Sequence, residues 1–239
     1  MQQNKSTYGW IVTGSGTAIN LALGALYTWS IFKSGLMDKF GLSAAEGALP
    51  YTVACLVFAF FMVPAGRLLD KAGPRVVASI GGVLVGIGFV ISSMATQANA
   101  MLMLTVGFGI MAGAGIGFGY ASATPAAIKW FPPEKKGLIA GIVVGGFGLA
   151  SVYVAPLTKW MISTYDVTGT FRILGIAFLV AIIGFAQLLK NPPDGYKPAA
   201  WGSSKKGKSD APPAPAARDY TWNEMLKTPQ FYLIWIMYT

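Results

Sequence analysis

The chain has 239 residues, of which 54% are hydrophobic and only 11% charged, whereas roughly a quarter of the residues of a soluble domain are charged. A soluble protein of this length cannot hide so much apolar surface, because its outer shell must face water. The chain has no histidine and one cysteine, Cys55, within an apolar run. This excludes an imidazole base, an internal disulfide and a multi-thiolate metal site. We therefore expect an integral membrane protein with no catalytic residue, metal or cofactor.

Six apolar stretches follow one another along the chain, each about as long as a helix needs to cross a bilayer. None has Asp, Glu or Lys in its interior, and they cover residues 9–32, 47–66, 76–96, 101–128, 138–158 and 172–189. The first is too long for the apolar region of a signal peptide, so we expect a retained helix. A seventh stretch begins near Pro229 and the sequence stops within it, so we interpret 228–239 as the start of a truncated seventh helix.

The basic residues predict the orientation of these helices. If the N-terminus is cytoplasmic, 14 of the 18 Lys and Arg residues lie on the cytoplasmic side and 4 lie outside, namely Lys33, Lys39, Lys159 and Arg172. Cytoplasmic loops of membrane proteins carry the excess of Lys and Arg, which favours this arrangement. The net charge of +9 then follows from topology, and no nucleic-acid partner is expected.

Residues 190–227 form the one long linker. The segment is rich in Pro, Ala, Lys and Ser and has no apolar period, which is typical of a hydrated loop. We expect a six-helix transmembrane bundle over 1–189, followed by a central cytoplasmic loop over 190–227.

Glycines four residues apart in three of the stretches predict close helix packing, since small residues let helix backbones approach each other in lipid. They are Gly82 and Gly86, then Gly109, Gly113 and Gly117 with Gly115 and Gly119 beside them, and finally Gly137, Gly141 and Gly145.

The loop between the second and third stretches reads GRLLDKAGPR over residues 66–75. It resembles the G-x-L-x-D-[RK]-x-G-[RKP]-[RK] motif of the major facilitator superfamily, at the cytoplasmic position where that family has it. The motif residues are Gly66, Asp70, Lys71, Gly73 and Arg75. Glycine permits a tight turn, and an aspartate there can meet a helix N-terminus or a basic side chain at the seam between the two halves.

Further segments narrow the resemblance. Tyr8-Gly9-Trp10, and then Trp130-Phe131-Pro132 with Gly146-Phe147-Gly148, resemble segments of monocarboxylate transporters. The second of these segments is closer still to bacterial oxalate:formate antiporters, and the run EMLKTPQF over 224–231 resembles the entry to helix seven in that bacterial branch. The resemblance implies the N-terminal six-helix half of a twelve-helix major facilitator fold, arranged as two inverted three-helix repeats around a midplane site.

The resemblance also implies an aromatic substrate site, whose residues fall on Tyr27, Tyr120 and Phe147. Asn20 lies seven residues before Tyr27 and hence on the same helix face. It is either a substrate contact or an interhelical hydrogen-bond partner, because an amide in lipid needs a partner. Animal monocarboxylate carriers have a lysine where this chain has Ile31, and Lys33 is expected at the outer mouth. The substrate-binding arginine of the family belongs to helix eight, beyond residue 239.

The leading functional hypothesis is secondary transport of a small monocarboxylate such as lactate or pyruvate across the cell membrane, with protons as the coupling ion. Oxalate/formate-type anion exchange is the nearest alternative. Multidrug efflux and a non-transporting membrane scaffold or sensor are further alternatives. An enzyme is not expected, since no nucleophile–base pair or metal cluster is evident.

Overall fold

The computed structural model describes residues 2–193, 195–196 and 222–238, and among these it is helical without any strand. The chain divides into a unit over residues 1–201 and a second unit over 202–239. Most of the linker expected over 190–227 lies outside the described residues, so its cytoplasmic location stays a prediction.

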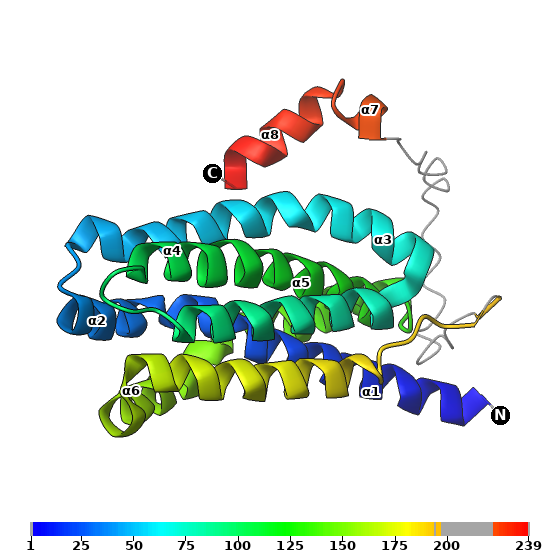
Figure 1. Cartoon of the computed structure of the whole chain (residues 1–239). Coiled ribbons are helices and arrows are strands. Elements are labelled where there is room, and N and C mark those ends of the chain that lie inside the picture. The colour runs from blue at the N-terminus through cyan, green and yellow to red at the C-terminus, as the bar shows by residue number, and fades with distance from the viewer. Residues whose placement is uncertain (1, 194, 197–221, 239) are drawn as a thin grey trace. The chain divides into compact units, whose positions relative to one another are not determined.

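The first unit is an all-helical bundle (Figure 1). Its helical segments are α1 (Gln2–Leu23), the 3₁₀ turn η1 (Gly24–Thr28), α2 (Trp29–Phe40), α3 (Ala44–Ser93), α4 (Ala100–Leu104), the π-helical segment η2 (Thr105–Ala112), α5 (Gly113–Ile128) and α6 (Pro133–Ala186). The second unit contains α7 (Trp222–Met225) and α8 (Pro229–Tyr238).

Four helical stretches are long and apolar enough to cross a membrane: Thr7–Phe40, Ala44–Ser93, Ala100–Ile128 and Pro133–Ala186. The second and fourth have 50 and 54 residues, so each would be about 75–80 Å long if straight, more than twice the roughly 30 Å hydrocarbon core. Each contains one residue with non-helical backbone angles, Gly73 and Asp166, and the chain folds back within each of them (Figure 1). The first unit therefore has the six spans that its hydropathy predicts. Span one is Thr7–Phe40, spans two and three are the parts of α3 before and after Gly73, span four is Ala100–Ile128, and spans five and six are the parts of α6 before and after Asp166.

Sequence explains where α3 begins and where it turns. Ser43 and Glu46 form a capping box: the Ser43 amide donates to the Glu46 carboxylate at 2.8 Å, and the Glu46 amide donates to the Ser43 hydroxyl at 3.3 Å. Gly73 has a φ of 79°, which glycine adopts without the steric cost that a Cβ brings. The sequence-based prediction of a glycine turn is therefore confirmed at Gly73. It is wrong for Gly66, which lies inside the helix before that turn.

Aromatic rings fill the bundle between the spans. Trp29 packs against Phe108 with ring centroids 4.2 Å apart, and Phe32 stacks on Phe171 at 4.4 Å. The Trp29 indole N–H donates to the Gly47 carbonyl at 2.9 Å, so this large ring is both packed and satisfied as a donor. The start of α2 is thereby fixed to the start of α3.

Glycine packing is confirmed in spans three and four. A Cβ added to Gly113 or Gly117 would lie 2.9 Å from a backbone carbonyl oxygen of span two, and one added to Gly115 would lie 2.6 Å from the Gly81 carbonyl oxygen. A Cβ added to Gly82 or Gly86 would lie 2.8 Å or 2.4 Å from a side chain of α6. The backbones of spans two, three and four therefore approach as closely as the small-residue spacing predicts.

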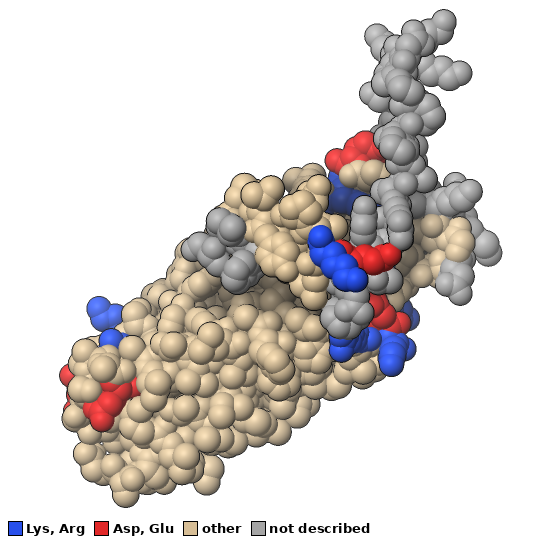
Figure 2. Space-filling view, turned by 90° about the horizontal axis from the view of Figure 1, so that it is seen from above, with Lys and Arg blue, Asp and Glu red and all other residues tan. Residues whose placement is uncertain are grey.

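In span five the same prediction is wrong for the described residues. Gly137, Gly141 and Gly145 have no neighbouring atom within 4 Å of where a Cβ would lie. Large apolar side chains beside them, such as Leu138 and Leu149, are about 60% exposed. Glycines four residues apart identify a helix face without side chains, but the spacing does not say which element packs against that face. Figure 2 shows a broad area without charged side chains on one face of the molecule, as expected of a surface that meets lipid or further membrane helices.

Candidate substrate site

The helix of span one is interrupted where Tyr27 lies. Residues Gly24–Thr28 form a 3₁₀ turn between α1 and α2, and the Thr28 hydroxyl donates to the Ala25 carbonyl at 2.7 Å. A Cβ at Gly24 would overlap the Phe147 carbonyl of α6, so the two backbones touch at this point. This close crossing sets the Tyr27 ring beside α6.

Four aromatic rings from four different segments meet there, and we call Tyr27, Phe58, Tyr120 and Phe147 the aromatic cluster. Phe147 lies at its centre, with ring centroids 5.1 Å from Tyr27, 5.2 Å from Tyr120 and 6.3 Å from Phe58. Phe58 also contacts Tyr120 edge to face at 5.7 Å. Such separations and angles are those that aromatic pairs prefer. The structure thus brings together the three aromatic residues named from the sequence.

Accessibility differs across the aromatic cluster. Phe147 is 5% exposed, whereas the Tyr27 side chain is 54% exposed, and Tyr120 and Phe58 are intermediate. Phe58 lies about midway between the ends of its span at Ser43 and Gly73. The cluster therefore presents a partly open aromatic wall with tyrosine hydroxyls, at a depth near the middle of span two.

Phe58 is the member that sequence reasoning missed. It belongs to the run VFAFF, in which nothing distinguishes one phenylalanine from another. Only its contacts with Tyr120 and Phe147 mark it, and these come from segments more than 60 residues away along the chain.

Asn20 is buried between span one and α6 rather than lining the aromatic cluster. Its side chain is 0% exposed, and its amide nitrogen donates to the Val143 carbonyl at 2.8 Å. Of the two sequence interpretations, the geometry favours the interhelical hydrogen bond. Its Oδ1 atom has no partner among the described residues.

Lys33, the basic residue nearest to the aromatic cluster along the chain, does not contact the cluster's central ring. The Lys33 methylenes pack against Gly47 in the first turn of α3, at the end of the bundle where the capping box lies. Ile31 lines a surface cavity of about 380 Å³ together with Asp38 and Lys159. Lys33 thus lies at the end of the bundle predicted from the sequence, away from the ring centre at Phe147.

At the same end, Lys39 forms an ion pair with Asp166. Asp166 is the one described non-glycine residue with a positive φ, 66°. Burial by itself raises the pKa of the Asp166 carboxyl, but hydrogen bonds from Lys39 and from the two following residues outweigh this, so the pKa lies below its ordinary value. These bonds hold the turn between spans five and six.

The motif loop occupies the opposite end. Asp70 and Lys71 are exposed on the last turn before Gly73. Arg75 follows the turn and donates to the Gln187 carbonyl at the end of α6, at 2.6 Å. A guanidinium at a helix C-terminus is favourable, since that end carries partial negative charge. Arg75 therefore ties the start of span three to the end of span six.

Comparison with known proteins places this arrangement in a family. The model of the Major Facilitator Superfamily matches residues 6–239. The chain is 29% identical over 224 residues to an uncharacterized transporter of this type, YhjX of Escherichia coli, covering 93% of this chain and 52% of that protein.

Two relatives carry more specific names. The oxalate:formate antiporter of Oxalobacter formigenes is 28% identical over 89% of this chain and 47% of its own length. Human monocarboxylate transporter 11 is 30% identical over 70% of this chain and 35% of its own length. The chain spans about half the length, or less, of these curated relatives. With six membrane spans that fit the N-terminal half of the fold, this chain belongs to the major facilitator superfamily.

Proposed function

We propose that this protein is a secondary transporter of small monocarboxylates, working by alternating access around a site near the bilayer midplane. The observation that carries the proposal is the convergence of Tyr27, Tyr120 and Phe147, with Phe58, into one partly exposed aromatic cluster. The names of two relatives, an oxalate:formate antiporter and a monocarboxylate transporter, support an organic anion as the substrate class.

The chemistry of the aromatic cluster limits what this half of the carrier contributes. Rings and hydroxyls can hold the short apolar body of a lactate-like acid and accept or donate single hydrogen bonds. A bare carboxylate in a low-dielectric cavity also requires a positive charge or several strong donors. No Lys or Arg lies in the interior of the six apolar stretches. We therefore expect the compensating cation, or the strong donors that could replace it, to come from outside these six stretches.

Exchange of oxalate-type and formate-type anions is the second candidate. It is favoured by the 28% identity to an oxalate:formate antiporter over 89% of the chain and by Ile31 in place of the lysine of animal monocarboxylate carriers. Proton-coupled uptake and exchange differ in what drives the substrate inward, so one assay separates them.

The test uses the full-length carrier, purified and reconstituted in liposomes, with labelled lactate outside. Proton-coupled transport requires uptake that rises when the lumen is alkaline, without any substrate inside. Exchange requires lactate, oxalate or formate inside, with little response to the pH gradient. If no small carboxylate moves under either condition, the proposed function is wrong.

We also propose that the end of the bundle bearing Gly73 is cytoplasmic. Among described residues of the first unit it carries Arg67, Lys71, Arg75, Lys129, Lys135, Lys136 and Lys190, against Lys33, Lys39, Lys159 and Arg172 at the opposite end, in keeping with the positive-inside rule. A matched pair of cysteines tests this in a Cys55→Ser background. Ala98→Cys should react with an impermeant thiol reagent added to intact cells, and Ala72→Cys should react only after lysis. The reverse pattern would contradict the orientation.

A further inference from the structure

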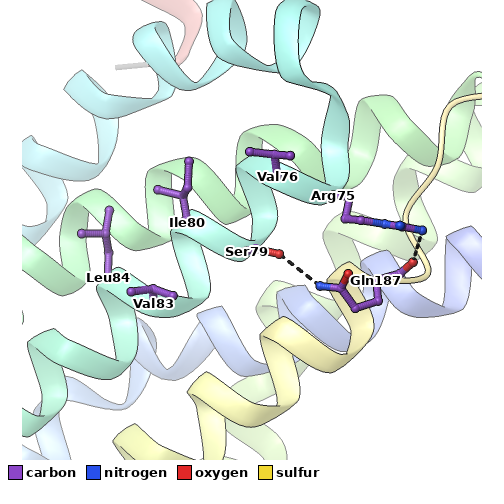
Figure 3. Close-up of a pocket in the computed structure, with 7 residues that line it drawn as sticks. All are labelled: Arg75, Val76, Ser79, Ile80, Val83, Leu84 and Gln187. Atoms are coloured by element: carbon purple, nitrogen blue, oxygen red, sulfur yellow. Dashed lines mark hydrogen bonds between the residues drawn. The ribbon is translucent and has the colours of Figure 1, made fainter.

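A groove on the first unit lies away from the aromatic cluster. It has a volume of about 430 Å³ and is lined by Arg75, Val76, Ser79, Ile80, Val83, Leu84 and Gln187. All but Gln187 come from the part of α3 that follows the Gly73 turn, and Gln187 comes from the end of α6 (Figure 3). The volume falls in the range of about 300–1,000 Å³ that is usual for small-molecule sites.

The groove is ordered by polarity along its length. Arg75 lies at one end, directly after the Gly73 turn. One helical turn further along α3, the Gln187 amide donates to the Ser79 hydroxyl at 3.3 Å (Figure 3). Val83 and Leu84 line the end of the groove that is farthest from Arg75 (Figure 3). A cation, then neutral polar groups, then hydrocarbon follow each other in the order of the phosphate, glycerol ester and acyl chain of a phospholipid.

The length of the groove matches the thickness of one leaflet of the bilayer. Arg75 and Leu84 are nine residues apart on a helix, about 13 Å at a rise of 1.5 Å per residue. Half of the hydrocarbon core of a bilayer is about 15 Å thick. A lipid with its headgroup at Arg75 would therefore place its acyl chain along Val83 and Leu84 without leaving its own leaflet.

Arg75 suits an anionic headgroup. Its guanidinium has five N–H donors; one Nη2 donor is held by the Gln187 carbonyl at 2.6 Å, which fixes the orientation of the planar fork. The Nε donor is buried and has no hydrogen-bond partner among the described residues, so the remaining Nη donors are the ones that a phosphate would meet. A guanidinium fork matches the geometry of phosphate oxygens. The groove thus holds an oriented cation whose hydrogen-bonding capacity is incompletely used.

The surface beside the groove is an exposed apolar stripe of the kind that meets lipid. Val76 and Val83 are 45% and 39% exposed, and Ile87 and Val90 continue the same apolar stripe at 41% and 36%. We propose that this groove binds one anionic phospholipid of the leaflet that contains the Gly73 turn, with its phosphate at Arg75. The test reads lipid binding and not transport, so it does not depend on the proposed function.

The experiment is a lipid titration of the purified, delipidated protein, read by native mass spectrometry. Phosphatidylglycerol and phosphatidylcholine with identical acyl chains are the two probes. The wild-type protein should bind one phosphatidylglycerol about fivefold more tightly than phosphatidylcholine, the effect of one basic residue at an anionic surface. Arg75→Gln should remove this preference and leave weak binding of both lipids.

A second variant keeps the proposal falsifiable if Arg75→Gln folds poorly. Val83→Trp fills the acyl end of the groove and should lower binding of both lipids, whereas Val90→Trp, two turns along the same exposed stripe, should bind as the wild type does. Equal affinity of the wild type for both lipids would overturn the proposal, as would equal behaviour of the two Trp variants. Displacement of phosphatidylglycerol by inorganic phosphate at the same concentration would reveal a free-anion site and would also overturn it.

Discussion

Removal of the Tyr27 hydroxyl isolates one hydrogen bond in the proposed substrate site. Tyr27→Phe keeps the ring, whose edge-to-face contact with Phe147 at 5.1 Å and 78° requires no hydroxyl. Tyr27 is 54% exposed, so water can reach this residue and satisfy its hydroxyl when the cavity is empty. The substitution should therefore leave the fold intact and act on substrate binding alone.

The expected magnitude follows from the exchange of one neutral hydrogen bond with water. Such a bond contributes a net 0.5–1.5 kcal/mol, about one on average. At 1.4 kcal/mol per factor of ten, the KM for a small monocarboxylate should rise about two- to twelvefold. The maximal rate should stay within about twofold of wild type, provided that the hydroxyl contributes equally to the bound ground state and the translocation transition state.

The assay is initial uptake of labelled lactate into liposomes as a function of its concentration. Tyr153→Phe is the matched control, because that hydroxyl donates to the Leu21 carbonyl at 3.0 Å. This control should lose about 1 kcal/mol of stability and keep its KM. An unchanged KM for Tyr27→Phe would remove Tyr27 from the site, and complete loss of transport would show a role larger than one neutral hydrogen bond.

Three further predictions concern other parts of the bundle. Phe147→Ala removes the central ring of the aromatic cluster and should shift the ratio of uptake rates from lactate towards bulkier acids; an unchanged ratio in well-folded protein would exclude a lining role. Asp70→Asn should insert normally yet slow transport in both gradient directions, since we expect this exposed carboxylate to hold the closed cytoplasmic seam; wild-type rates in both directions would contradict this. Asp166→Asn keeps a residue that tolerates positive φ but loses the ion pair with Lys39, which lies near the surface and is worth less than about 1 kcal/mol. Because the folded-state pKa of Asp166 is depressed, its stabilisation is present above the ordinary pKa of 3.8 and disappears as the pH falls through the folded value. Melting temperatures should accordingly differ between wild type and Asp166→Asn at pH 7 and converge at strongly acidic pH, and a constant difference would refute the electrostatic explanation.

Much of the site could be named from sequence only through resemblance to a family. Tyr27, Tyr120 and Phe147 came from the family pattern, and the structure brings their rings within about 5 Å of a common centre. Phe58 could not be found, because packing between distant segments distinguishes it from its neighbours in VFAFF. Asn20 shares a helix face with Tyr27, yet its amide is taken up by the Val143 carbonyl, and a one-dimensional pattern cannot say which neighbour a buried amide meets.

Of the two turns within α3 and α6, sequence predicts the backbone of one and not of the other. Gly73 belongs to a motif and carries the φ that glycine alone adopts easily, so its turn was predictable. The turn at Asp166 was implied by the hydropathy gap between spans five and six, but its positive φ was not. The Asp166 carboxylate accepts a local hydrogen bond from the Thr168 hydroxyl and a second one from Lys39, 127 residues away along the chain, which only tertiary packing supplies.

Sequence by itself determined that this chain crosses a membrane six times in its first unit, because the transfer of about 20 apolar residues into lipid is a local property of each stretch. Tertiary structure decided what each helix face meets. Glycines four apart pack tightly in span four and lie open in span five, although the spacing is the same. The reason is that spacing describes a surface, whereas contact also requires a partner surface, and partners in this fold come from segments that lie far apart along the chain.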